Sequence, residues 1–190
     1  MELKTRILKG VTPYDGSPLG GHWAYLRHGV QGDSLLAFRG PCRVDVGALA
    51  DLEDAKHGAF IYSPDMLHFV LELFGPRLEE AVARQWLMAA TVLETLNRAQ
   101  SKGRVERDGN DLWVGKRKLS VSIAAPTGVS VKVHFGINVD AEGAPVPAIG
   151  LKELGVRPGP FGAALLRRFA DDHSRMGLAR SKVRLYPGGL

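Results

Sequence analysis

The 190-residue sequence contains a single cysteine, Cys42, so no disulfide can form within the chain. Aromatic residues make up only 7% of it, and no apolar run approaches the roughly 20 residues that span a membrane. The first ten residues, MELKTRILKG, alternate charged and apolar side chains and lack the apolar centre of a signal peptide. Together these absences predict a cytoplasmic protein that has no disulfide framework and no membrane partner.

The charge distribution argues against nucleic acid as a partner. The formal net charge is only +5, and the basic residues are scattered along the chain. The longest basic cluster, Lys116–Lys118, lies inside a predicted strand region, whereas nucleic-acid binding requires a basic face with interleaved aromatic residues. A hydrophobic content of 45% is enough for a substantial core, so we expect one domain over residues 1–190.

The stretch from residue 110 to residue 140 has the strongest pattern in the sequence. Apolar residues occupy every second position over 119–123 and again over 131–139, with a Pro-Thr-Gly turn at 126–128. This period of two predicts an antiparallel hairpin with its apolar side chains in the core. We expect the other face to collect a polar row of Lys118, Ser120, Ser122, His134 and Asn138. A ligand-binding wall and an ordinary edge hairpin are both consistent with such a row.

The remaining segments predict a mixture of strands and helices. Strands are expected at 2–9, 34–38, 42–46 and 60–62. Ser63-Pro64-Asp65 has the composition of a helix start, and apolar residues follow it at helical spacing over 66–73. Further helices are expected over 78–99 and 162–176. This order predicts an α+β fold with a single mixed or antiparallel sheet flanked by helices.

Two segments of the hairpin region resemble a known group of enzymes. Residues 110–120, NDLWVGKRKLS, and 134–140, HFGINVD, are similar to strands of biotin ligases, lipoate ligases and octanoyltransferases, and 58–69, GAFIYSPDMLHF, is a weaker match. The resemblance implies the biotin/lipoate protein ligase catalytic-domain fold, which is class II synthetase-like. The whole chain more closely resembles a prokaryotic family grouped with these ligases by fold, domain of unknown function 366, through GHWAY, QGDSLLAF, GPCRV, DMLHF and KLSVSIA.

The resemblance implies two catalytic residues. Lys118 matches the lysine beside the carbonyl that becomes the acyl adenylate, where a cation stabilises developing negative charge. Lys116 is the alternative, because a change of strand phase by one residue exchanges the two lysines. Asp111 matches an acidic position near the adenylate and its magnesium, so Mg²⁺ and ATP are the cofactors implied. The alternatives are a surface lysine and an ordinary turn aspartate.

Other polar residues complete the candidate set. We expect Ser120, Ser122, His134 and Asn138 to bind a ligand from the hairpin, and His68 to face the sheet from the predicted helix. Each of these residues also has a purely structural alternative. His22, His28 and His57 show no metal-ligand spacing, which disfavours a zinc site and leaves other metals open.

The chain departs from the ligase pattern in the two segments that carry phosphate-binding and nucleophilic residues in that group of enzymes. Ligases carry arginines and glycines in the phosphate-binding loop, but residues 51–58 here are DLEDAKHG, which puts ATP use in doubt. Octanoyltransferases carry a nucleophilic cysteine where this chain has Pro147–Gly150. The leading hypothesis is therefore a ligase or acyltransferase relative that binds a small carboxylate-bearing or nucleotide-like molecule. A non-catalytic binding protein and a homodimeric interaction subunit are the alternatives.

Overall fold

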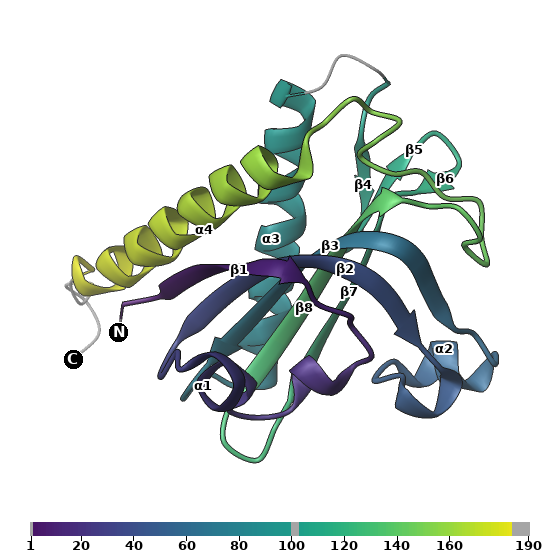
Figure 1. The fold of residues 1–190 in the computed structure, drawn as a ribbon. Coiled ribbons are helices and arrows are strands. Elements are labelled where there is room, and N and C mark those ends of the chain that lie inside the picture. Colours follow the sequence, from purple (N-terminus) through teal and green to yellow (C-terminus); the bar gives the residue numbers. More distant parts are fainter. Residues whose placement is uncertain (1, 100–102, 184–190) are drawn as a thin grey trace, which may run out of the picture.

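The computed structural model describes residues 2–99 and 103–183, and a twisted five-stranded sheet lies at its centre (Figure 1). The strands lie in the order β1-β2-β3-β8-β7. The first pair, β1 and β2, is parallel, and every other neighbouring pair is antiparallel. The sheet is built from β1 (Lys4–Val11), β2 (Ser34–Val44), β3 (Ile61–Leu73), β7 (Ser120–Pro126) and β8 (Val131–Asp140). The expected mixed α+β architecture is therefore confirmed.

Shorter elements lie around this sheet. A second, three-stranded sheet is formed by β4 (Glu106–Asp108), β5 (Asp111–Val114) and β6 (Arg117–Lys118). The chain passes from β6 into β7 through the buried residue Leu119. Four short helical segments are η1 (Ser17–Leu19), α1 (Trp23–His28), η2 (Val46–Ala48) and α2 (Leu52–Lys56).

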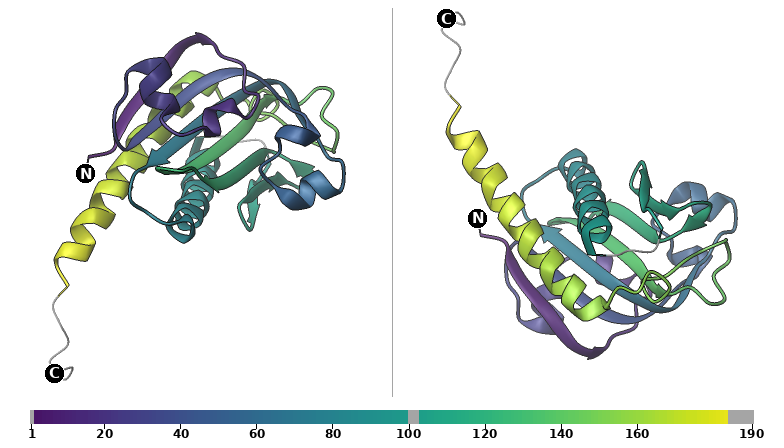
Figure 2. Two further views of the ribbon diagram at one scale, coloured as in Figure 1. Left: turned by 90° about the horizontal axis from the view of Figure 1, so that it is seen from below. Right: turned by 90° about the horizontal axis from the view of Figure 1, so that it is seen from above.

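Two long helices cover one face of the five-stranded sheet (Figures 1 and 2). The first, α3 (Leu78–Ala99), packs on β7 and β8, and α4 (Pro158–Ser181) packs on β1 and β2. Glu79 and Glu80 lie in the first turn of α3, where negative charge is favourable. The main hydrophobic core lies between these helices and the sheet. Only the first half of α4 is buried, and its second half projects past the sheet (Figure 2).

The predicted helix over residues 66–73 is wrong, because this segment is part of the central strand β3. Residues 66–73 are all buried, since β2 and β8 flank the strand and both sheet faces are covered. Such a strand is apolar on both sides and shows no alternation, so its sequence resembles that of a buried helix. The Ser63–Asp65 segment forms a bulge where the register shifts, and Ser63 Oγ donates to the carbonyls of Asp65 and Asp140.

Other boundaries differ in extent. The two strands expected over 34–38 and 42–46 are one continuous strand, β2. The pairing of β2 with β3 shifts register in this region, and the extra residue of that bulge lies on β3. The final helix runs from Pro158 to Ser181 and is longer than the predicted 162–176. The predicted helix over 78–99 coincides with α3, and the predicted hairpin coincides with β7 and β8.

A smaller core lies on the sheet face opposite α3 and α4. It contains Tyr14, Phe38, Cys42, Val44, Met66 and Val70. The segment before α1 places Tyr14 over this face, because the Tyr14 amide and carbonyl both pair with the end of β2. The chain between β2 and β3, which carries η2 and α2, lies on the same side and leaves a hollow above β7 and β8.

Candidate functional site

A cavity of about 320 Å³ lies on the sheet face opposite α3 and α4. Its floor is formed by β7, β8 and Tyr14, and its walls come from the β2–β3 connection, from residues 144–148 and from the start of β5. Apolar side chains such as Met66, Val121 and Ile123 line it together with a small number of polar groups. This composition is typical of a small-molecule site.

Lys118 and Asp111 meet at this cavity. Lys118 Nζ lies 2.8 Å from Asp111 Oδ2, and both side chains are 28% exposed. The small sheet brings them together, because Asp111 begins β5 and Lys118 ends β6. The Lys118 ammonium also lies 5.7 Å from the centre of the Trp113 ring. The two residues nominated as catalytic are thus an ion pair that lines the cavity.

The backbone of Lys118 is fixed by the loop that follows β8. Its amide donates to the carbonyl of Pro147 at 2.9 Å, and its carbonyl accepts from the amide of Ile149 at 3.0 Å. The Asn138 side-chain amide donates to the carbonyls of Lys118, at 3.4 Å, and Ile149, at 3.3 Å. Asn138 therefore joins the loop to the small sheet, and it also lines the cavity.

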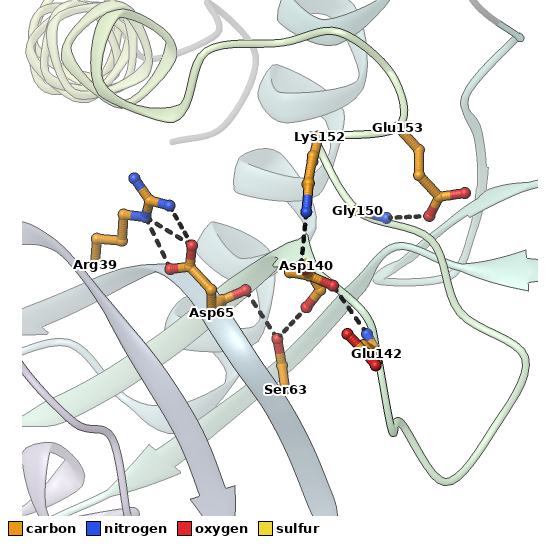
Figure 3. A network of polar contacts seen from close by, with 8 residues as sticks. All are labelled: Arg39, Ser63, Asp65, Asp140, Glu142, Gly150, Lys152 and Glu153. Carbon is orange, nitrogen blue, oxygen red and sulfur yellow. Dashed lines mark hydrogen bonds and ion pairs between the residues drawn. The ribbon is translucent and has the colours of Figure 1, made fainter.

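The same loop is anchored below the cavity by a polar network (Figure 3). Asp140 accepts from Lys152 Nζ at 3.3 Å and from the Glu142 amide at 3.1 Å. Ser63 connects the Asp140 carbonyl to the bulge in β3, where Asp65 forms a forked ion pair with Arg39 (Figure 3). These contacts hold both ends of the loop, so its wall of the cavity is fixed to the sheet.

The two serines do not share a face with His134 and Asn138, so that part of the predicted polar row is wrong. Ser122 pairs with Phe135 on the helix-covered side, and its Oγ accepts from Gln85 of α3 and from Asn110, both at 2.9 Å. Ser120 Oγ is buried and accepts from the Leu112 amide at 3.0 Å. Both serines border the cavity, but their hydroxyls form hydrogen bonds with other residues of the protein.

The two histidines nominated from distant segments meet on the cavity side of the sheet. His68 lies on β3, and its Nδ1 is 3.0 Å from His134 Nε2 on β8. His68 Nε2 is 3.2 Å from the carbonyl oxygen of Gly40. The Tyr14 ring stacks on His134 with centroids 3.8 Å apart. His134 lines the cavity, whereas His68 lies behind it.

Burial sets the protonation state of these groups. It lowers the pKa of His68 from 6.5 to about 4 and moves the pKa of His134 well below 6.5, with the neighbouring His68 acting in the same direction on His134. Both imidazoles are therefore neutral at neutral pH. Burial also raises the pKa of the Tyr14 hydroxyl, which stays protonated.

Lys116 lies apart from this arrangement. It sits in the exposed turn between β5 and β6 and does not line the cavity. Cys42 is fully buried on β2, where burial raises the pKa of its thiol to about 12. A thiol held in its protonated form is a poor nucleophile, which agrees with its position in the smaller core.

The wall formed by the β2–β3 connection carries carboxylates. Asp51 caps α2 by accepting from the amides of Glu53 and Asp54, and both Asp51 and Asp54 line the cavity. Among the lining residues, all of which lie in the described part of the chain, Lys118 is the only Lys or Arg. Across residues 2–99 and 103–183, no group of three or more His, Cys, Asp or Glu side chains is placed to hold a metal. This lining therefore offers a triphosphate one ammonium, together with carboxylates that repel it.

Sequence reasoning missed Tyr14 and the buried pair Glu72–Lys132. Tyr14 belongs to a Pro-Tyr-Asp-Gly turn, and nothing in that turn indicates a ring placed over the sheet. Lys132 was part of the predicted alternation, but its partner lies 60 residues away on β3. The position of Lys132 inside an apolar strand was the one feature of the sequence that could have indicated a buried ion pair.

The fold defines the class of protein. It is an α+β domain with the biotin/lipoate ligase architecture. A biotin protein ligase from Aquifex aeolicus, solved with biotin and ATP, superposes with a TM-score of 0.56 at 17% identity, over 88% of this chain and 69% of that one. Ta0514 from T. acidophilum, assigned as a lipoate protein ligase and solved with lipoic acid, gives 0.55 at 16% identity, over 88% and 84%. At these identities the likeness shows the fold alone.

The family follows from closer relatives. Residues 3–184 match the model of the family described as a domain of unknown function, DUF366, and the chain belongs to that family. A protein of unknown function from Pyrococcus horikoshi is 38% identical with a TM-score of 0.91, over 97% of this chain and all of that one. The uncharacterized protein MJ0805 of Methanocaldococcus jannaschii is 37% identical over 157 residues, which are 80% of this chain and 70% of that one.

One further finding concerns the helices. Within the described residues, none of them is both long enough and apolar enough to cross a membrane.

Proposed function

We propose that this protein binds a small organic acid in the cavity above β7 and β8, and that the Lys118 ammonium donates to an oxygen of its carboxyl or acyl group. The observation that carries the proposal is the Lys118–Asp111 ion pair on the cavity wall. An ammonium has three N–H donors, so contact with one carboxylate leaves donors for a ligand oxygen. Asp111 and Trp113 restrict the lysine to one position, which favours binding because less side-chain freedom is then lost.

The same contact supports a role in acyl chemistry. A cation beside a carbonyl stabilises the negative charge that develops when the carbonyl is attacked. The fold shared with biotin and lipoate ligases favours a ligand with an acyl group, because the biotin and lipoic acid bound in those structures are both carboxylic acids. Asp51 and Asp54 repel a triphosphate, so the proposed acyl ligand is not one that this chain activates with ATP.

Binding without turnover is the second candidate, and the lining of the cavity favours it specifically. No lining residue is a cysteine or an arginine, and the lining lies entirely within the described residues. A thiol to attack an acyl carbon and an arginine to hold phosphate are thus absent from this lining.

Titrations of octanoate, lipoate and biotin, followed by thermal shift and calorimetry, test the proposal. We expect at least one acid to raise the melting temperature, and Lys118→Ala to weaken its binding about tenfold, because a hydrogen bond to a charged group is lost. Lys116→Ala is the matched control and should bind as the parent does, since Lys116 lies outside the cavity. Equal affinities for the parent and Lys118→Ala would contradict the proposal.

Turnover separates the two candidates. Parent protein is incubated with the bound acid as its thioester, together with an amine acceptor, and acyl transfer is followed by mass spectrometry. Product formation that depends on Lys118 indicates an acyltransferase. Saturable binding with no product identifies a binding protein.

A further inference from the structure

The cavity floor contains two buried ring side chains, and each has one polar atom without a hydrogen-bond partner among the described residues. Tyr14 and His134 each line the cavity and are each only 3% exposed. Their rings are nearly parallel, with an angle of 12° between the planes. Neither the Tyr14 hydroxyl nor His134 Nδ1 makes a hydrogen bond to any residue that the structure describes. Neither atom is among the fully buried unpaired atoms of the described residues, so both keep some accessible surface and are available to a ligand in the cavity.

The hydrogen bonds behind the floor fix which nitrogen of His134 carries its proton. The Gly40 carbonyl can only accept, so the Nε2 of His68 donates to it and the His68 Nδ1 is left as an acceptor. His134 Nε2 must then donate to His68 Nδ1, at 3.0 Å. A neutral imidazole has one N–H, so His134 Nδ1 carries a free lone pair. The relay from Gly40 through His68 thus makes His134 Nδ1 an acceptor.

The charged groups around the cavity determine which kind of ligand donor can hydrogen-bond to His134 Nδ1. The carboxylates in the cavity lie on its accessible walls, with Asp54 exposed and Asp51 and Asp111 partly exposed. An ammonium on the buried floor would lose its water without gaining a carboxylate there, which is costly. A neutral N–H group has no such penalty. The Tyr14 ring that stacks on His134 carries a hydroxyl, which can donate to a carbonyl oxygen.

We propose that His134 and Tyr14 form a subsite for a neutral amide-type group, such as a lactam or primary amide. His134 Nδ1 accepts from the ligand N–H, and the Tyr14 hydroxyl donates to the ligand carbonyl. This inference rests on the proposed function only in placing the ligand in the same cavity. It adds a second recognition point to Lys118, so the ligand class becomes an organic acid that also carries an amide or lactam.

Nitrogen NMR of the ¹⁵N-histidine-labelled protein tests the subsite with 2-pyrrolidinone and N-methyl-2-pyrrolidinone as probes. Neither probe has a carboxylate, so the result does not depend on Lys118. We expect ligand-free His134 to have its proton on Nε2, and 2-pyrrolidinone to shift the Nδ1 resonance. The N-methyl probe should bind about tenfold more weakly, because it lacks the hydrogen-bond donor.

Two variants sharpen the test. His134→Phe keeps a ring against Tyr14 and should remove the preference between the probes, whereas Lys118→Ala should retain it. If His134→Phe does not fold, the comparison of the two probes on the parent stands by itself. A proton on Nδ1 in the free protein, an equal response to both probes or no response to either would overturn the subsite. Binding of organic acids without a lactam response overturns the subsite alone, and the reverse result overturns the proposed function alone.

Discussion

The Nζ atom of Lys132 lies 2.9 Å from Oε2 of Glu72, and both side chains are buried, at 0% and 1% exposure. The other carboxylate oxygen of Glu72 accepts from Ser130 Oγ at 2.9 Å and from the His22 amide at 2.7 Å. The pair therefore joins β3, β8 and the start of α1. Burial alone would raise the pKa of Glu72, but the hydrogen bonds and the charge of Lys132 hold it below its usual value.

Replacing Lys132 with methionine should lower the free energy of unfolding by about 3–5 kcal/mol, because the Glu72 carboxylate is left buried without its counter-ion. Lys152→Met is the matched control. Its ion pair with Asp140 is largely exposed, with 75% of the lysine accessible, and we expect a much smaller loss. Urea denaturation followed by circular dichroism measures both. Similar losses for the two variants would show that the buried pair has no special role.

The buried histidines predict a loss of stability in mild acid. Unfolding returns His68 to a pKa of 6.5, whereas in the folded protein it is about 4 because of burial. The stabilisation is therefore complete above pH 6.5 and is lost as the pH falls towards 4. A difference of this size corresponds to about 3 kcal/mol, and His134 shifts in the same direction.

Unfolding free energies measured across this pH range check the prediction. His68→Phe should flatten the dependence whatever its absolute stability, because the slope reports only protons taken up on unfolding. Gly128→Ala, at an exposed position with no titratable group, provides the control and should keep the parent's slope. A parent protein equally stable at both ends of the range would contradict the buried, neutral state of the histidine pair.

Gly150 fits its position because it has no side chain. A Cβ atom there would lie 2.4 Å from the carbonyl oxygen of Val139 and 2.7 Å from the carbonyl carbon, and these backbone atoms cannot move aside. We expect Gly150→Ala to destabilise the protein by about 1–3 kcal/mol through overpacking. Gly128→Ala in the β7–β8 turn, where nothing lies within 4 Å, should change stability by about 0.5 kcal/mol or less. Thermal melts of both variants decide the comparison.

The carboxylates of the β2–β3 connection predict that Mg²⁺·ATP does not stabilise the parent protein. Asp51, Asp54 and Asp111 face one cavity that has a single ammonium, so a triphosphate meets net repulsion. The double variant Asp51→Asn, Asp54→Asn keeps a capping side chain on α2 and should bind Mg²⁺·ATP more tightly than the parent. Calorimetric titration of the two proteins is the measurement. Saturable binding by the parent would show that the acidic wall tolerates a nucleotide.

Local periodicity was a good guide wherever the apolar side chains of an element lie on one side of it. The alternation over 119–139 predicted β7, β8 and their turn, and the apolar spacing over 78–99 predicted α3. The period in β8 and α3 reflects an apolar side that meets the main core, although the polar side of β8 is buried as well. Residues 66–73 lack that asymmetry. Their strand conformation was decided by pairing with β2 and β8, which lie far away in the sequence.

Local periodicity also failed to predict which side chains of the hairpin region lie on the same face. Strict alternation from Lys118 through Ser120 to Ser122 placed all three side chains together. In the structure the chain leaves the small sheet at Lys118 and enters the large one at Ser120, and this change of sheet separates the lysine from the serine hydroxyls. No local pattern marks a transfer between sheets, because both segments are extended.

The sequence by itself determined the fold class, the hairpin and the presence of Lys118 and Asp111 near its start, since these depend on short-range periodicity and on residue type. Only the tertiary structure decided that Lys118 and Asp111 form an ion pair on the wall of a cavity, and that His68 and His134, 66 residues apart, form a relay beneath Tyr14. The acidic wall at Asp51 and Asp54 was visible in the sequence, but its place in the same cavity was not. Contacts of this kind form when segments that are distant in the sequence pack together. The free energy that favours them depends on several segments at once, so no single stretch of the sequence predicts them.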